Sequence, residues 1–156
     1  NKLKVNSISR IDDKLASLEK QSFDLEKQLE KLQQELMNNE IDRIKELFLK
    51  GSQYNTLLFK SKLDGKLAKN VVDNLANELE NTVVFGAFVN EDKINFACRV
   101  PKIAIEKGIK AGDLVKQAAI ITNGNGGGKP DFAQAGGKDT SKVDESLELI
   151  QQIVAL

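Results

Sequence analysis

The sequence contains no histidine and a single cysteine, Cys98. Structural zinc sites use several thiolate or imidazole ligands, and serine or cysteine nucleophiles usually depend on a histidine base. Zinc sites and this kind of nucleophilic catalysis are therefore excluded for the chain itself. A single cysteine also forbids an internal disulfide and fits a reducing, cytoplasmic compartment. Because free cysteine is commonly buried, we expect Cys98 to be a small core residue.

Long apolar runs, a signal-peptide pattern and an excess of charge are also lacking. A membrane-spanning helix needs about 20 mostly apolar residues, so we expect no membrane span. The 23 basic side chains are balanced by 23 acidic ones. Any nucleic-acid binding must therefore come from a local basic patch, because the chain as a whole carries no positive field. The chain begins with Asn1 rather than methionine, and we expect it to be part of a longer protein.

Residues 1–50 carry the heptad pattern of a coiled coil. The pattern has Ser22 as its one polar interruption, and no proline or glycine precedes Gly51. Apolar residues at alternating steps of three and four form one seam along a helix, which must be buried against a partner. A helix of roughly 45 residues would be about 65 Å long at a rise of about 1.5 Å per residue. The seam consists of Ile8, Ile11, Leu15, Leu18, Leu25, Leu29, Leu32 and Leu36.

The sequence leaves open what covers this seam. The helix can pair with a second copy of the chain or with an upstream helix of a parent protein. It can also turn at Asn38-Asn39 and pack on a second helix within residues 40–50, or fold back on the globular part. An absent partner is favoured, because a seam of this length is difficult to cover with a domain of about 100 residues.

Residues 51–156 predict a globular α+β domain. The order β-α-β-β-α-β-α indicates a mixed β-sheet flanked by helices. The clearest strands are TVVFGAFV and KINFACRV, which the tight turn at residues 90–92 joins into an antiparallel hairpin. Ser141 is the expected N-cap of the last helix. The predicted strands are 54–60, 82–89, 93–100 and 132–135, and the predicted helices are 65–80, 111–121 and 141–156, with a short turn or helix at 104–107.

The stretch from residue 123 to residue 139 is rich in glycine and is predicted to be a loop. It reads NGNGGGKPDFAQAGGKD. Glycine permits unusual dihedrals and close approach, and exposed main-chain N–H groups can form a concave nest for a phosphate or a base edge. Neither common nucleotide pattern fits, because Lys129 is followed by Pro130 and stands where a dinucleotide-binding loop needs its third glycine. From the residues alone, a flexible surface loop is an equal alternative to a binding loop.

The run GGGKPDFAQAGGKD resembles the glycine-rich signature of the C-terminal domain of bacterial alanyl-tRNA synthetases. That signature has three or more glycines, a basic residue, Pro-Asp, an apolar residue and Ala-Gln-Ala-Gly-Gly. The order of a heptad-bearing helix, a sheet-and-helix domain of the DHH-associated type and a final helix is similar as well. The resemblance covers the whole chain, although only the glycine-rich run is highly specific.

The resemblance implies a function for the chain within a larger ligase. The parent would be a class II alanine–tRNA ligase that uses ATP, magnesium and zinc in domains outside residues 1–156. The chain itself would hold no catalytic residue, metal or cofactor. It would bind tRNA(Ala) near the elbow and help present one tRNA to the aminoacylation and editing sites. Its helical part would form a homodimer or pack on the rest of the parent.

Candidate RNA contacts follow from the glycine-rich run and from local positive charge. An RNA elbow is recognised through phosphates, 2′-hydroxyls and exposed bases, which main-chain N–H groups and cationic side chains can contact. A second basic cluster, from Lys60 to Lys69, follows the first strand, and Lys60-Ser61-Lys62 and Lys129 are the stronger candidates. The predicted RNA-binding residues are Gly126, Gly127, Gly128, Lys129, Lys138, Lys60, Lys62, Lys66 and Arg99.

Two other functions remain as alternatives. The chain can be a structural coiled-coil dimerisation module, or an accessory substrate-binding domain of a DHH-type phosphoesterase. In those phosphoesterases a similar loop carries a histidine after the glycines, whereas Lys129 occupies that place here. Lysine can contact a phosphate but cannot reproduce the stacking or hydrogen bonding of an imidazole. We therefore do not expect the chain to cleave RNA.

Overall fold

The computed structural model describes residues 2–155, and side chains from residue 10 onward, in two compact units that comprise residues 1–39 and 40–156. Helix α1 (Lys2–Lys45) is continuous, so the alternative turn at Asn38-Asn39 does not form. From Glu40 onward the helix belongs to the second unit, in which Ile41 and Ile44 are buried. The alternative helical hairpin within residues 40–50 is therefore also absent.

The seam of α1 is exposed. The seven seam side chains from Ile11 to Leu36 are 49% to 65% exposed, and the heptad pattern runs along one uninterrupted helix. Ile8, the first member of the predicted seam, lies outside the described side chains. Among the described residues, no helix is long and apolar enough to cross a bilayer.

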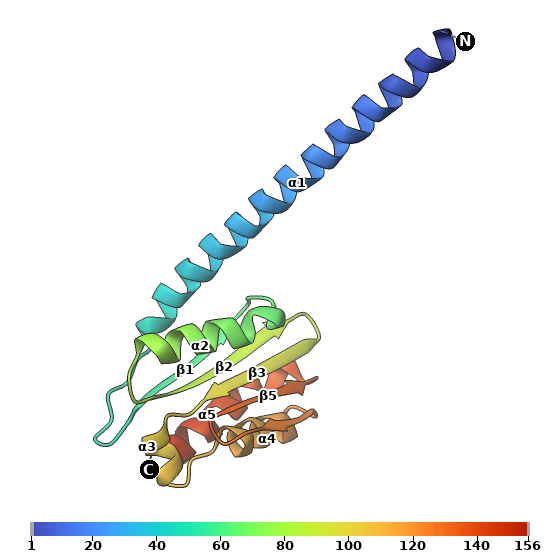
Figure 1. Cartoon of the computed structure of the whole chain (residues 1–156). Coiled ribbons are helices and arrows are strands. Elements are labelled where there is room, and N and C mark those ends of the chain that lie inside the picture. The colour runs from blue at the N-terminus through green and yellow to red at the C-terminus, as the bar shows by residue number, and fades with distance from the viewer. Residues whose placement is uncertain (1, 156) are drawn as a thin grey trace. The chain divides into compact units, whose positions relative to one another are not determined.

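The second unit contains a mixed five-stranded sheet in the order β1-β2-β3-β5-β4 (Figure 1). Strands β1 and β2 are parallel, and all other neighbours are antiparallel. The strands are β1 (Asn55–Ser61), β2 (Thr82–Asn90), β3 (Lys93–Arg99), β4 (Asn125–Gly128) and β5 (Phe132–Gly137). The helices are α2 (Ala68–Glu78), α3 (Lys102–Glu106), α4 (Ala111–Ile121) and α5 (Val143–Val154), with 3₁₀ turns η1 (Gly65–Leu67) and η2 (Thr140–Lys142).

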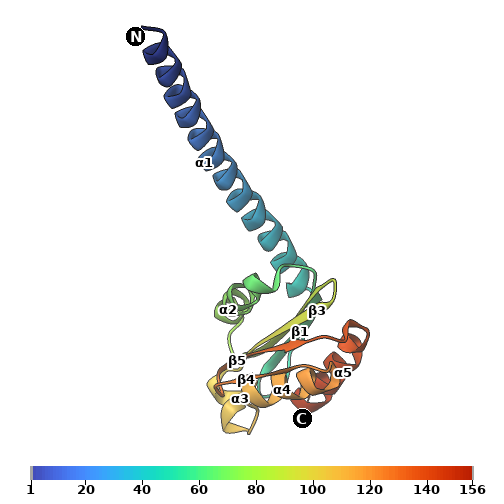
Figure 2. The ribbon, with the colours of Figure 1, turned by 90° about the vertical axis from the view of Figure 1, so that its right-hand side faces the viewer.

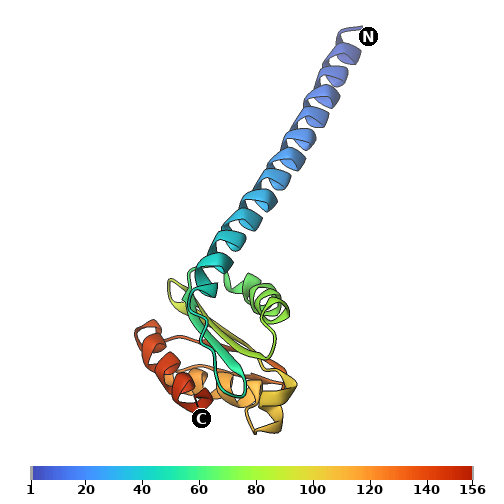
Figure 3. The same cartoon turned by 90° about the vertical axis from the view of Figure 1, so that its left-hand side faces the viewer.

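Helices cover both faces of this sheet. Figures 2 and 3 show α2 on one side of the sheet and α4 and α5 on the other. Strand β2 is buried on both faces because alternate side chains meet different helical layers. Phe85 belongs to the core on the α4 and α5 side, whereas Phe88 makes an edge contact with Phe59 at a ring-centroid distance of 5.7 Å. The predicted α+β class with a mixed sheet is confirmed.

Two local predictions were wrong. Residues 125–128, expected to be part of a loop, form strand β4, because their main chain pairs with β5 and packs under α4. Ser141 was expected to cap the last helix, but α5 begins at Val143 after the turn η2. Asp139 instead caps the turn η2, and its carboxylate accepts hydrogen bonds from the Ser141 N–H at 3.2 Å and from the Ser141 hydroxyl at 2.6 Å.

Candidate nucleic-acid interface

The glycine-rich segment is a β-hairpin at one edge of the sheet. Helix α4 ends where Asn123 adopts a φ of +53°, and the Gly124 N–H donates to the Ala119 carbonyl at 2.7 Å. This left-handed residue after the last turn is a common helix ending and directs the chain into β4. The β4–β5 turn closes with the Lys129 N–H donating to the Phe132 carbonyl at 2.9 Å. The segment is therefore fixed by main-chain bonds at both ends of β4.

The glycines of β4 face two different environments. Gly126 and Gly128 are paired with Ala135 and Ala133, whose side chains belong to the core under α4. A side chain at Gly128 would meet the Ala133 Cα at 2.6 Å, and one at Gly126 would collide with Ala135. At Gly127, by contrast, an added Cβ would meet no heavy atom within 4 Å. Gly127 therefore presents bare main chain on the opposite face of the sheet, the side that carries α2.

The N–H groups of these glycines do not converge into one nest. In an antiparallel ladder, hydrogen-bonded pairs alternate with non-bonded pairs. Since Lys129 and Phe132 close the hairpin, the next bonded pair along the register is Gly127 with Gln134. The N–H groups of Gly126 and Gly128 then point outward from the edge of the sheet, and the Gly126 N–H contacts the Asn125 side-chain oxygen at 2.8 Å. The expected loop nest is replaced by an edge strand.

A charged and aromatic surface borders this bare strand. Arg99 on β3 is paired with Phe132 on β5. The Lys69 ammonium lies 5.9 Å from the centre of the Phe132 ring, and the Arg99 Nη1 lies 3.5 Å from the Asp73 Oδ1. Gln134 is exposed between the buried residues Ala133 and Ala135, which places its side chain on the same face as Gly127. We call this the α2–β5 surface; its residues are Lys69, Asp73, Arg99, Gly127, Phe132 and Gln134.

The α2–β5 surface has basic residues at both ends. Lys129 lies in the β4–β5 turn, near the end of β3 that carries Arg99, because the Val100 N–H donates to the Asp131 carbonyl at 2.9 Å. Lys138 follows the other end of β5, where Gly137 is paired with Ile94. Lys62 and Lys66 lie toward that second end, where Asn90 accepts a hydrogen bond from the Gly65 N–H and donates one to the Lys62 carbonyl, both at 3.3 Å. Five of the predicted RNA-binding residues thus belong to this surface or lie next to one of its ends.

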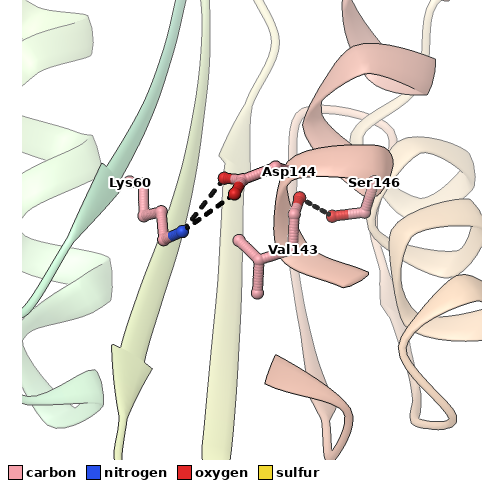
Figure 4. A network of polar contacts seen from close by, with 4 residues as sticks. All are labelled: Lys60, Val143, Asp144 and Ser146. Atoms are coloured by element: carbon pink, nitrogen blue, oxygen red, sulfur yellow. Dashed lines mark hydrogen bonds and ion pairs between the residues drawn. The ribbon is translucent and has the colours of Figure 1, made fainter. Parts of the chain in front are cut away.

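Lys60 lies on the other face of the sheet. Its ammonium contacts both carboxylate oxygens of Asp144 in α5, at 3.0 and 3.2 Å (Figure 4). The neighbouring Val143 is buried, and its carbonyl accepts a hydrogen bond from the Ser146 hydroxyl at 2.6 Å. Ser61 is the buried last residue of β1, and Lys62, whose carbonyl accepts a hydrogen bond from Asn90, follows the strand, so the predicted trio Lys60-Ser61-Lys62 is not one patch. The structure separates Lys60 from the other candidate cations.

Sequence reasoning missed the contributions of Asp73, Phe132 and Gln134. Asp73 follows Lys69 by four residues on α2, which places the two on one helical face. That spacing was a usable signal for a charged helix face. The approach of Asp73 to Arg99 depends on α2 packing over β3, and that of Lys69 to Phe132 depends also on β3 pairing with β5. The sequence carries no comparable signal for either arrangement.

The two titratable groups whose pKa is raised by burial lie away from this surface. Complete burial raises the pKa of the Cys98 thiol far above its ordinary value, so the sulfur remains a neutral core atom. Burial also raises the pKa of Tyr54, whose hydroxyl donates to the Val154 carbonyl at 2.9 Å. Within the described residues, no three acidic or thiol side chains gather as they would to hold a metal ion.

The fold and the hairpin define a known class of domain. Residues 51–156 match the DHHA1 domain, and the chain belongs to this family. Comparison with individual proteins identifies a narrower group of relatives. The chain is 36% identical over 157 residues to the alanine–tRNA ligase of Bacillus cytotoxicus and 32% identical over 155 residues to that of Staphylococcus aureus. These alignments cover 98% and 99% of the chain but only 17% and 18% of the two ligases.

A solved structure supports the same relationship. The C-Ala domain of the Aquifex aeolicus alanyl-tRNA synthetase superposes with a TM-score of 0.62 and is 27% identical in sequence. The superposition covers 70% of this chain and 98% of that domain. The resemblance to the C-terminal domain of alanyl-tRNA synthetases is therefore confirmed.

Proposed function

We propose that the globular unit binds RNA on the α2–β5 surface. The observation that carries this proposal is the bare main chain at Gly127, beside the aromatic ring of Phe132 and the cations Lys69 and Arg99. An aromatic face can stack on an exposed base, a guanidinium can contact a phosphate or a base edge, and main chain without side chains allows RNA to come close. Lys62, Lys66, Lys129 and Lys138 extend the cationic border, while Lys60, bound to Asp144, is a weaker candidate.

The relatives suggest which RNA this is. Because the similar proteins are alanine–tRNA ligases, we propose that the parent joins alanine to its tRNA and that this chain grips tRNA(Ala) near the elbow. It would thereby help present one tRNA to aminoacylation and editing sites, in the cytoplasm. ATP, magnesium and zinc would serve the parent's other domains. The proposed tRNA binding by this chain requires no metal ion, no bound ATP and no catalytic residue.

Gel-shift titration of the 156-residue chain tests this function. Full tRNA(Ala) contains the elbow, whereas an acceptor-stem minihelix does not. We expect the full tRNA to bind at least tenfold more tightly at the same salt concentration. Equal binding of the two RNAs, or binding of neither, would contradict recognition of the elbow by this chain.

We also propose that α1 associates with another helix through its exposed seam. Seven branched apolar side chains at 49% to 65% exposure form a stripe that a coiled coil would bury. The positions that flank the seam on one side carry the acidic residues Asp12, Glu19 and Glu26. An antiparallel second copy would set this acidic row against itself, whereas a parallel copy would set Lys14 against Glu19 of its partner. Charge therefore favours a parallel homodimer over an antiparallel one.

Pairing with the parent remains the alternative for this helix. An upstream helix would then need basic residues opposite the acidic row. Sedimentation equilibrium of the 156-residue chain distinguishes the two arrangements. A concentration-dependent dimer supports the homodimer. A monomer at all concentrations up to about 100 µM would instead favour pairing of the seam with a helix of the parent protein.

A further inference from the structure

Asp73 and Arg99 form an unusual ion pair on the α2–β5 surface. The Arg99 Nη1 and the Asp73 Oδ1 are 3.5 Å apart, beyond the usual hydrogen-bond range of about 2.7–3.2 Å. Asp73 Oδ1 is buried, yet it accepts no hydrogen bond from any described residue. The Arg99 side chain is 40% exposed. The guanidinium is therefore held by charge without being locked by hydrogen bonds.

This pair changes the charge that RNA meets. Lys69 and Arg99 are the cations beside Phe132. The acidic residue Asp73 contacts Arg99 and lies on the same face of α2 as Lys69. A carboxylate at this distance offsets much of the positive potential of Arg99 at longer range, while the planar guanidinium keeps donors for a ligand that approaches closely. Asp73 therefore lies where its charge can affect which ligands bind to Arg99.

We propose that Asp73 is a specificity-determining residue that competes with RNA for Arg99. The proposal rests on RNA binding by the α2–β5 surface. An RNA whose shape brings a phosphate or base edge into contact with Arg99 replaces the loose ion pair by charge-assisted hydrogen bonds. An RNA that meets the surface only through diffuse charge finds Arg99 already neutralised. Asp73 thus lowers affinity for every RNA, and lowers it most for RNAs of the wrong shape.

The substitution Asp73→Asn tests this role because it keeps the shape of the side chain and removes its charge. We expect the minihelix to bind about two- to fivefold more tightly, the range that corresponds to losing a partly exposed ion pair. Full tRNA should gain less, so the ratio of the two affinities falls. The slope of the logarithm of the binding constant against the logarithm of salt concentration should steepen by roughly 0.7–0.9, as for one added phosphate contact.

Two further variants show whether Asp73 acts through Arg99. In an Arg99→Gln background, Asp73→Asn should change neither the affinities nor the salt slope. Glu148→Gln, on α5 at the other face of the sheet, removes the same charge and should leave the ratio of affinities unchanged. An equal effect of Asp73→Asn in the Arg99→Gln background, or an unchanged salt slope in the wild-type background, overturns the proposal. Weaker binding by a folded Asp73→Asn protein overturns it as well.

A measurement without RNA separates this inference from the proposed function. The chain has three arginines, Arg10, Arg43 and Arg99, so phenylglyoxal labelling can be mapped to each by peptide analysis. We expect Asp73→Asn to raise the labelling rate of Arg99 at least twofold and to leave the rates of Arg10 and Arg43 unchanged. An unchanged labelling rate of Arg99 would show that Asp73 does not restrain the Arg99 guanidinium, even if tRNA binds. If the rate rises but no RNA binds, the proposed RNA function fails and the role in RNA selection fails with it.

Discussion

Gly112 of α4 lies directly against Gly128 of β4: a methyl group on Gly112 would stand 2.9 Å from the Gly128 carbonyl oxygen. The helix can approach the edge strand this closely because neither residue carries a side chain. The glycines of β4 therefore have two roles. Gly126 and Gly128 allow α4 and β5 to pack, and Gly127 leaves the opposite face bare.

This division predicts different effects of alanine at neighbouring positions. Gly128→Ala places a Cβ 2.6 Å from the Ala133 main chain, so the strand or the helix must shift. We expect its free energy of unfolding to fall by about 1–3 kcal/mol, the usual cost of overpacking. Gly127→Ala, the matched control, should leave that free energy unchanged or slightly higher. Urea unfolding followed by circular dichroism measures both, and equal losses would contradict the assignment of faces.

Burial of Cys98 predicts a loss of stability at alkaline pH. The pKa of the thiol is raised above its ordinary 9.0 in the folded chain, so the unfolded thiol ionises first. Its contribution to stability is complete below pH 9 and declines as pH rises above 9, by up to about 1.4 kcal/mol per pH unit. Urea unfolding at pH 8, 9 and 10 should show this decline.

Cys98→Ala provides the control for this effect. It removes the ionisable group, so the decline between pH 9 and pH 10 should become shallower even though the variant starts from a lower stability. The raised pKa of Tyr54 adds a similar decline only above pH 10. Equal slopes for the wild type and Cys98→Ala between pH 9 and pH 10 would show that the thiol is not protected by the core.

The exposed seam predicts association that depends on particular side chains of α1. Replacing Leu25 and Leu29 with glutamine removes two central apolar contacts but keeps good helix formers. We expect the dimer dissociation constant to rise at least 100-fold in sedimentation equilibrium, since each buried leucine contributes roughly 1.5–3 kcal/mol. Phe23→Gln is the control, because Phe23 is exposed but lies outside the heptad seam. A similar loss for Phe23→Gln would mean that association does not use the seam.

The ion pair between Lys60 and Asp144 predicts different contributions of Lys60 and Lys62 to RNA binding. Lys62→Gln should reduce the salt slope by roughly 0.7–0.9, as for one lost phosphate contact. Lys60→Gln should change it by less than half as much, because the Lys60 ammonium already contacts Asp144. Its cost in unfolding free energy should also stay below about 1 kcal/mol, because this ion pair is well exposed. A larger effect of Lys60 on the salt slope would place the RNA on the α5 side.

Much of the fold follows from sequence pattern. The β2–β3 hairpin was predicted from two apolar runs joined by a tight turn, and helix α4 has the bounds that its apolar spacing indicates. Strand β4 could not be predicted in the same way. Four residues of the type NGGG have little intrinsic preference for a strand, and only pairing with β5 and packing under α4 make one.

The candidate site was also predictable only where local sequence pattern determines it. The glycine-rich run and the lysines were visible as residue types, and their resemblance to a known signature gave them a function. The separation of Lys60 from Lys62 was not predictable from the strand pattern, because it depends on the contact of Lys60 with Asp144 of α5 and on the end of β1 at Ser61. The meeting of Arg99 with Asp73, however, requires α2 to cross over the face of β3, a long-range arrangement that local pattern does not encode.

We propose that RNA lies on the bare face of the β4–β5 hairpin, and the substitution Gly127→Val probes this placement. Space is open above Gly127, and valine favours a strand, so the variant should unfold at the same urea concentration as the wild type or a higher one. Its branched side chain would stand where RNA must approach. We predict that the dissociation constant for full tRNA(Ala), measured at fixed salt concentration, rises at least tenfold. An unchanged dissociation constant in the folded variant would mean that RNA does not bind this face of the hairpin.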